Sequence, residues 1–285
     1  MDAHARAAVR RARADKPLRL GLIGFGAIAQ SLVQCLDASL ASGDIDIVTV
    51  LVRSPRQAIG QSSTLSKTVF TTQIDHFLQH DPGLVVECAG HSAVRDTCPE
   101  ILSRGFDLVV ISIGALADRG VEERLRAAAE GSSGRLTLPS GAVGGLDLLA
   151  SARLAGLDSV RYVSRKPPAA WKGTRAEHLI GLEKHTRAIE IFNGNARDAA
   201  LQFPQNANVA AAIALSGIGF EKTEVTLNAD PQARGNEHSI LAEGIFGRAE
   251  LHVSGNPLPQ NPKTSWLAAL SLARAVLNSR ARVII

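Results

Sequence analysis

A glycine-rich turn near the start of the chain has the spacing of a dinucleotide-binding loop. Gly24, Gly26 and Ala29 form the pattern G-x-G-x-x-A, which follows an apolar run and opens a helical pattern. Gly24 permits a tight turn, Gly26 lets the backbone approach a pyrophosphate, and Ala29 lets the helix pack closely on the strand. Free N–H groups at the start of the helix attract the anion. The alternative is a purely structural turn. The expected cofactor contacts are Gly24, Phe25, Gly26, Ala27 and Ile28.

The residues after the second apolar run bear on the choice of cofactor. An NAD-selective site ends this strand in Asp or Glu, whose carboxylate accepts hydrogen bonds from the ribose hydroxyls. Here the strand ends in Arg53, followed by Ser54 and shortly afterwards by Arg56. Because a guanidinium pairs with a 2′-phosphate, we expect NADP(H) to bind near Arg53 and Ser54, with NAD(H) as the alternative cofactor. The competing interpretation is that both arginines are solvated loop charges.

Two further apolar runs end in small residues. Ala89, Gly90 and His91 follow one of them, and residues 112–115 follow the next. Ligands of open α/β sheets lie beyond the carboxyl ends of the strands, so we expect Ala89 and Gly90 to leave room for the nicotinamide ribose. His91 is expected to contact the substrate or the cofactor, or else to cap the helix that begins there.

Polar residues of the second half gather in three segments: 164–172, 203–208 and 234–238. A dianionic substrate needs cations, and the candidates are Arg165, Lys166 and Lys172. His238 is the candidate proton-transfer group, because an imidazole titrates near neutral pH. The alternatives are solvated loop charges for the cations and, for His238, a strand-edge histidine bonded to a loop.

The elements that must position these residues alternate along the first half of the chain. Apolar runs typical of buried strands are separated by stretches typical of helices. Strands that are apolar on both faces indicate a parallel sheet covered on both sides, and so a Rossmann-type, doubly wound α/β domain over residues 17–140. The expected strands are 18–24, 45–52, 68–71, 84–88, 108–112 and 135–138, and the expected helices are 27–36, 74–79, 93–103 and 121–130.

The pattern changes after residue 140. Longer strands with one polar face favour an open, largely antiparallel sheet, and so a second, α+β domain for substrate binding and dimerisation over residues 141–262. We expect segment 263–285 to form a final helix that packs back on the first domain. The expected strands are 157–165, 187–192, 223–228, 239–246 and 248–254, and the expected helices are 141–155, 196–202, 208–216 and 265–279.

Length and composition exclude several classes of protein. A chain of 285 residues, 45% hydrophobic and 20% charged, is neither fibrous nor largely disordered, and suits two modest domains. Five of the 31 basic and two of the 27 acidic residues lie in a basic N-terminal extension, 1–16, so the remainder is nearly neutral and nucleic-acid binding is not indicated. The longest apolar stretches, 108–117 and 209–220, are too short for a membrane span. Three cysteines without metal or disulfide spacing predict no metal site and a reduced, cytoplasmic protein.

Six segments together resemble one known family. GLIGFGAIA, CAGHSAVRD, LPSGAVGGLD, SRKPP, FPQNANVAA and GNEHSI occur in order within residues 18–279, and they resemble the L-aspartate dehydrogenase family. The resemblance implies NAD(P)-dependent oxidative deamination of L-aspartate to iminosuccinate, then oxaloacetate and ammonia, or the reverse amination. It also implies that iminosuccinate feeds NAD biosynthesis in some bacteria.

The same resemblance implies roles for three residues. Ala142 in SGAVGG and Asn208 in QNANVA correspond to cofactor contacts, and His238 in GNEHSI corresponds to the catalytic acid/base. His238 would activate the water that attacks the imine carbon. A homodimer through the second-domain sheet is expected. The alternatives are another two-domain reductase, of the dihydrodipicolinate reductase or sugar dehydrogenase kind, and a non-catalytic NADP(H) sensor.

Overall fold

A computed structural model describes residues 16–54, 65–180, 186–259 and 261–284 of the chain. The predicted basic extension, apart from Lys16, and the predicted loop charge Arg56 lie outside the described residues. None of the helices in the described part of the chain is both long and apolar enough to cross a membrane.

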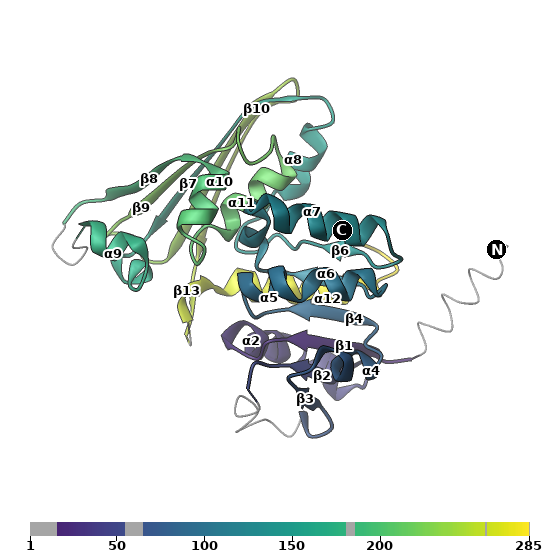
Figure 1. Ribbon diagram of the computed structural model, residues 1–285. Helices are drawn as coiled ribbons and strands as arrows, with labels where there is room; N and C mark the ends of the chain where they lie inside the picture. The colour runs from purple at the N-terminus through teal and green to yellow at the C-terminus, as the bar shows by residue number, and fades with distance from the viewer. Residues whose placement is uncertain (1–15, 55–64, 181–185, 260, 285) are drawn as a thin grey trace.

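The first domain is built on a parallel sheet. Its strands are β1 (Leu18–Ile23), β2 (Ile45–Leu51), β3 (Val69–Thr71), β4 (Leu84–Glu87), β5 (Leu108–Val110) and β6 (Leu136–Thr137). Within the described residues they lie in the order β3-β2-β1-β4-β5-β6, and every pairing is parallel (Figure 1). This is the order of a Rossmann-type sheet, so the predicted fold class of this half is confirmed.

Helices cover both faces of this sheet because its strands are apolar on both faces. They are α2 (Ala27–Cys35), α3 (Asp37–Ala41), α4 (Ile74–Gln79), α5 (His91–Asp96), α6 (Cys98–Ser103), the 3₁₀ helix η3 (Ile113–Ala117) and α7 (Arg119–Glu130). Leu84 and Val86 of β4 join the apolar core on the α2 face, whereas Val85 between them joins the core beneath α5 to α7. Successive side chains of β4 point to opposite faces of the sheet, so one strand contributes to the apolar cores on both faces.

The second domain is built on a mixed, mainly antiparallel sheet. Its strands are β7 (Leu157–Lys166), β8 (Ile189–Asn195), β9 (Glu224–Ala229), β10 (Asn236–Gly244) and β11 (Gly247–Gly255). In the described residues their order is β11-β10-β7-β9-β8, and only the β7–β9 pairing is parallel. The predicted second sheet is therefore confirmed.

One face of the second sheet is covered and the other is open. The further elements of this half are α8 (Leu146–Ala152), η4 (Pro168–Trp171), α9 (Arg175–Ile180), α10 (Ala196–Gln202), α11 (Asn208–Ser216) and the pair β12 (Pro257–Leu258) and β13 (Asn261–Ser265). The even-numbered residues from 160 to 166 in β7 and from 236 to 242 in β10 are buried, and the odd-numbered residues of both strands are partly or fully exposed. Val160, Tyr162, Ile240 and Ala242 among them share one apolar core with residues of α10 and α11. The same core includes Ile113 of η3, so the two domains share one apolar interior.

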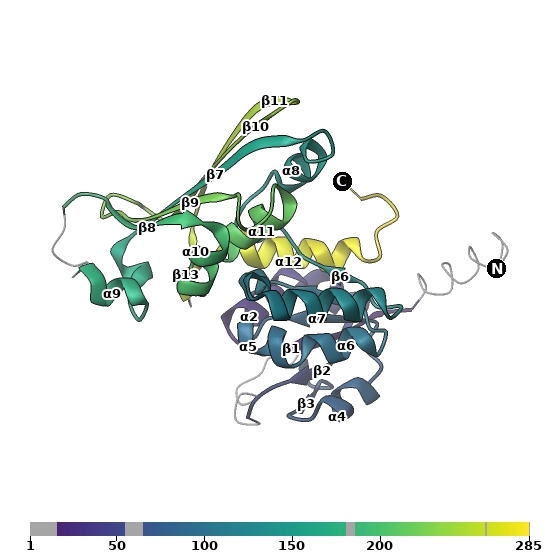
Figure 2. The ribbon, with the colours of Figure 1, turned by 45° about the horizontal axis from the view of Figure 1, so that its top comes forward.

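The last helix, α12 (Trp266–Asn278), returns to the first domain. Figures 1 and 2 show it lying along the parallel sheet, and Leu272, Ala273 and Val276 join the core on the α2 face. These three positions lie on one side of the helix, so α12 packs an apolar face against the first domain.

Several element boundaries differ from the sequence-based expectation, as the starts of α8 and β10 and the division of one predicted helix illustrate. The helix expected from residue 141 begins only at Leu146, because Gly141 and Gly145 have positive φ values of 68° and 73°, which helices exclude. The helix expected over 93–103 divides at Thr97 into α5 and α6. The strand expected from residue 239 begins at Asn236, because its ladder with β7 continues past His238 to Glu237.

The packing of α12 predicts the effect of one truncation. Leu272 is fully buried, so Leu272→Ala should lower the free energy of unfolding by about 2–5 kcal/mol, measured by urea denaturation. Leu270→Ala in the same helix is the matched control, because that side chain is 48% exposed. Equal effects of the two substitutions would contradict the packing described here.

Candidate active site

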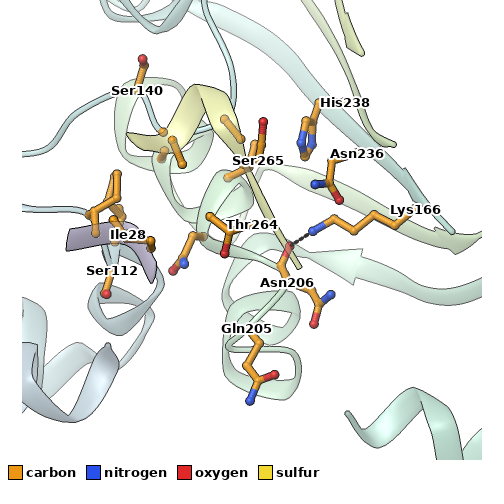
Figure 3. Close-up of a pocket in the computed structure, with 18 residues that line it drawn as sticks. Ile28, Ser112, Ser140, Lys166, Gln205, Asn206, Asn236, His238, Thr264 and Ser265 are labelled. Atoms are coloured by element: carbon orange, nitrogen blue, oxygen red, sulfur yellow. Dashed lines mark hydrogen bonds between the residues drawn. The ribbon is translucent and has the colours of Figure 1, made fainter. Parts of the chain in front are cut away.

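A cleft lies between the carboxyl edge of the parallel sheet and the covered face of the second sheet. Its lining comes from α2, the end of β5, the loop after β6, β7, the loop before α11, β10, β13 and the starts of α11 and α12. In Figure 3, Ile28, Ser112 and Ser140 lie on one side, and Lys166, Asn236 and His238 lie on the other. The cleft thus has a nucleotide-domain wall and a polar wall.

Strand alternation places the polar wall. Lys166 is the last residue of β7, and Asn236 and His238 belong to β10, which pairs antiparallel with β7. All three side chains occupy even positions, which face inward, and each residue is at most 4% exposed. Two adjacent strands therefore deliver an amine, an amide and an imidazole to one buried surface.

His238 presents one ring nitrogen for chemistry. Its Nδ1 lies 2.7 Å from the hydroxyl oxygen of Tyr162, and its buried Nε2 has no hydrogen-bond partner among the described residues. Burial, and then the nearby Lys166 ammonium, lower the pKa of His238 to about 3. The imidazole is therefore neutral near pH 7, and a neutral imidazole can accept or donate a proton.

Lys166 is the cation of the cleft wall. Its Nζ donates a hydrogen bond to the backbone carbonyl of Asn206 at 3.3 Å. Burial lowers the pKa of Lys166 to about 8, so most of the amine is charged at pH 7. An ammonium has three N–H donors, so the carbonyl of Asn206 leaves Lys166 able to donate to a further group. An anionic group is the ligand that a buried ammonium favours.

The opposite wall fits a dinucleotide. Gly24 has φ 84°, and a Cβ there would lie 2.7 Å from the Cβ of Ala89, so only glycine fits. A Cβ on Gly26 would meet open space, and no side chain caps the N-terminus of α2. Free backbone N–H groups and an open approach suit a pyrophosphate. Ile28 of α2 lines the cleft. Phe25 instead packs edge-on against Phe70, with their ring centroids 5.5 Å apart.

Glu87 connects the loops that follow β4 and β5. Its side chain is fully buried, and one carboxylate oxygen, Oε1, accepts from the N–H of Ala89 at 2.7 Å, the N–H of Gly90 at 2.6 Å and the hydroxyl of Ser112 at 3.0 Å. The other oxygen accepts from the N–H of Ser112 at 3.0 Å. Burial raises the pKa of Glu87 more than these hydrogen bonds lower it, so the pKa lies above its ordinary value. Sequence analysis missed this residue, although an acid in the run LVVEC was a signal.

Asn208 joins the two domains at the cleft. Its Oδ1 accepts from the N–H of Gly114 at 2.9 Å and lies 3.0 Å from Nε2 of His91. Because that oxygen is an acceptor only, His91 is the donor in this contact. The structure therefore brings the predicted residues His91 and Asn208 together with each other.

The remaining predicted residues lie in different places. Ala142 lines the cleft. Arg165 occupies an odd position of β7 and so lies on the face of the sheet away from the cleft. Its guanidinium pairs with Asp230, and its Nη1 lies 3.8 Å from Oε2 of Glu237. Lys172 is exposed at the end of η4 and is not among the lining residues. Arg53 and Ser54 follow β2 at the carboxyl edge of the parallel sheet, with Arg53 exposed.

Comparisons with known proteins agree with this geometry. Residues 147–279 match the family model described as aspartate dehydrogenase, C-terminal, and residues 24–139 match the homoserine dehydrogenase NAD-binding domain. An L-aspartate dehydrogenase of Ralstonia nicotianae is 44% identical over 92% of this chain and 97% of its own. The chain belongs to the L-aspartate dehydrogenase family.

Two further members support the same assignment. An L-aspartate dehydrogenase of a Polaromonas species is 44% identical over 94% of this chain and 100% of its own. The crystal structure of aspartate dehydrogenase from Thermotoga maritima is 28% identical and superposes with a TM-score of 0.72, covering 94% of this chain and 99% of that one. The likeness therefore extends over both domains.

The bonds of Glu87 predict the effect of a neutral replacement. In Glu87→Gln, either orientation of the amide sets an NH₂ group against a backbone N–H, so cofactor affinity should fall about tenfold and stability by about 1–3 kcal/mol. Cofactor fluorescence titration and urea denaturation measure the two effects. Glu123→Gln, at an exposed position of α7, is the control. Unchanged affinity in Glu87→Gln would refute the linking role.

Proposed function

We propose that this chain is an L-aspartate dehydrogenase. The observation that carries the proposal is the buried pair of His238 and Lys166 in a cleft whose opposite wall fits a dinucleotide. L-Aspartate loses a hydride from its α-carbon and a proton from its amine to give iminosuccinate. Water then adds to the imine carbon, and oxaloacetate and ammonia are released. The reverse sequence aminates oxaloacetate.

The cofactor would be held by the nucleotide-domain wall. Proposed contacts are Gly24, Phe25, Gly26, Ala27, Ile28, Arg53, Ser54, Ala89, Gly90, Ala142 and Asn208. When bound, NAD(P) supplies hydride transfer, and the protein supplies position and electrostatics. Arg53 favours NADP(H) because its guanidinium can pair with a 2′-phosphate, and NAD(H) is the second cofactor to assay.

His238 is the proposed catalytic acid/base. The Nε2 lone pair of a neutral imidazole takes a proton from the water that attacks the imine carbon, and Nε2–H returns it in the reverse direction. An imidazole that were charged at neutral pH could not serve as this base. The lowered pKa of His238 keeps the base form populated.

Lys166 is the proposed partner of a substrate carboxylate. Its ammonium is held inside the cleft beside His238, whereas Arg165 faces away and Lys172 lies outside the lining. His91, bonded to Asn208 at the cleft edge, is retained as a candidate substrate contact. A charge-assisted bond in a desolvated cleft both binds the substrate and fixes its orientation.

We also propose a metabolic role, an oligomeric state and a cellular location. Iminosuccinate would supply NAD biosynthesis, as the family resemblance implies. A homodimer would form through the open face of the second sheet, where Val163 and Leu241 are only partly buried. The cysteines Cys35, Cys88 and Cys98 form no disulfide, which supports a cytoplasmic location.

Turnover tests the proposal directly. Purified protein with L-aspartate and either NAD⁺ or NADP⁺ should produce reduced cofactor, and His238→Asn should lower this rate about 10²- to 10⁴-fold. Cofactor affinity should stay within about twofold, because His238 lies on the opposite wall. His76→Asn, on α4 remote from the cleft, is the matched control. Cofactor binding without turnover in the wild type would instead support a sensor.

The lowered pKa of Lys166 predicts a pH dependence. The group is protonated below about pH 8 and loses its charge above it, so kcat/KM for L-aspartate should fall as pH rises through about 8. Lys166→Gln should lower kcat/KM at pH 7 and abolish this decline. Lys222→Gln, an exposed site, should leave the profile unchanged. A decline that persists in Lys166→Gln would assign it to another group.

A further inference from the structure

Tyr162 lies beside His238 on the covered face of the second sheet. It is 1% exposed and is absent from the cleft lining, whereas His238 is part of that lining. The strand register explains its reach: His238 pairs with Ser164 across the β7–β10 ladder, and Tyr162 is two residues further along the same face of β7. A diagonal neighbour at that spacing is within reach of an aromatic side chain.

The two rings are held in a defined arrangement. Their planes differ by 16° and their centroids are 6.0 Å apart, while the Tyr162 hydroxyl lies 2.7 Å from Nδ1 of His238. Burial raises the pKa of Tyr162, so the hydroxyl keeps its proton. With Nδ1 occupied, Nε2 is the nitrogen left to act in the cleft.

The kind of partner matters for a group that must work in both directions. A carboxylate at Nδ1 would stabilise the imidazolium. Tyr162 is neutral, and the charged or titratable groups acting on His238 are Lys166 from β7 and His252 from β11, both of which disfavour a positive ring. A hydroxyl can donate to Nδ1 or accept from it, so either tautomer of the neutral ring is supported.

We propose that Tyr162 is the positioning residue of the proton-transfer site, holding Nδ1 of His238 so that Nε2 faces the cleft, where it takes a proton from the attacking water while Nδ1 keeps its own proton, and returns that proton in the reverse direction. The proposal rests on the proposed function only in assigning proton transfer to His238. The hydrogen bond and its effect on the tautomer are properties of the protein without substrate.

The first test needs no turnover. In ¹⁵N-histidine-labelled protein, the resonances of His238 are identified by their loss in His238→Asn, and their shifts report protonation and tautomer. We expect a neutral ring from about pH 5 to 9, with shifts that change in Tyr162→Phe. Unchanged shifts in Tyr162→Phe would overturn the proposal, whether or not the protein oxidises L-aspartate.

Kinetics form the second test. Tyr162→Phe should lower kcat about 10- to 100-fold in both directions, with little change in the KM of the cofactor and a displaced pH profile of kcat. Ser159→Ala is a matched control, because it removes a hydroxyl from the opposite face of β7, where the Ser159 hydroxyl lies 3.4 Å from Oε2 of Glu243. Equal losses in both variants, or none in Tyr162→Phe, would contradict a positioning role.

A third variant covers the case in which Tyr162→Phe does not fold. Tyr162 is the single tyrosine of the chain, so biosynthetic incorporation of 3-fluorotyrosine changes the acidity of this hydroxyl alone. The His238 shifts and kcat should then move together, with kcat changing by about two- to tenfold. A purely structural tyrosine would leave both unchanged, and that result would refute the proposal.

Discussion

The burial of an amine and an imidazole on one face of the β7–β10 ladder is the constraint on which the site depends. Two ionisable groups withdrawn from water raise the free energy of the protein unless their charges are suppressed or paired. His238 meets this constraint by remaining neutral, and Lys166 meets it with one carbonyl of Asn206. Under the proposed function, an anionic substrate would complete the pairing of Lys166. Under the same proposal, the burial that raises the free energy of the cleft would also favour a carboxylate beside a neutral base.

The opposite wall is fixed by polar contacts of another kind. Glu87 satisfies backbone N–H groups of two strand-end loops, and Asn208 reaches from the second domain to Gly114 and His91 of the first. Around these contacts, η3, α10 and α11 share one apolar core. Hydride transfer requires two walls held at a fixed separation, and this common interior provides the rigidity that a flexible linker would not.

Local patterns predicted the elements well and the site only in part. Apolar runs and glycines located every strand of both main sheets, and the bounds of α10 and α11 agree with those expected. Arg165 and Lys166 looked equivalent as neighbouring cations, but adjacent residues of a strand point to opposite faces, and only Lys166 enters the cleft. Tyr162 carried no local signal, because its contact with His238 depends on a register set between residues 76 positions apart.

A crystal structure with NADP⁺ and the unreactive dicarboxylate succinate tests the central claim most directly. We expect succinate in the cleft, with one carboxylate on Nζ of Lys166 and Nε2 of His238 within about 2.6–3.2 Å of the ligand or of a bridging water. Succinate bound instead against Arg165 or Lys172, with His238 out of reach, would contradict the assignment of the polar wall as the reacting site.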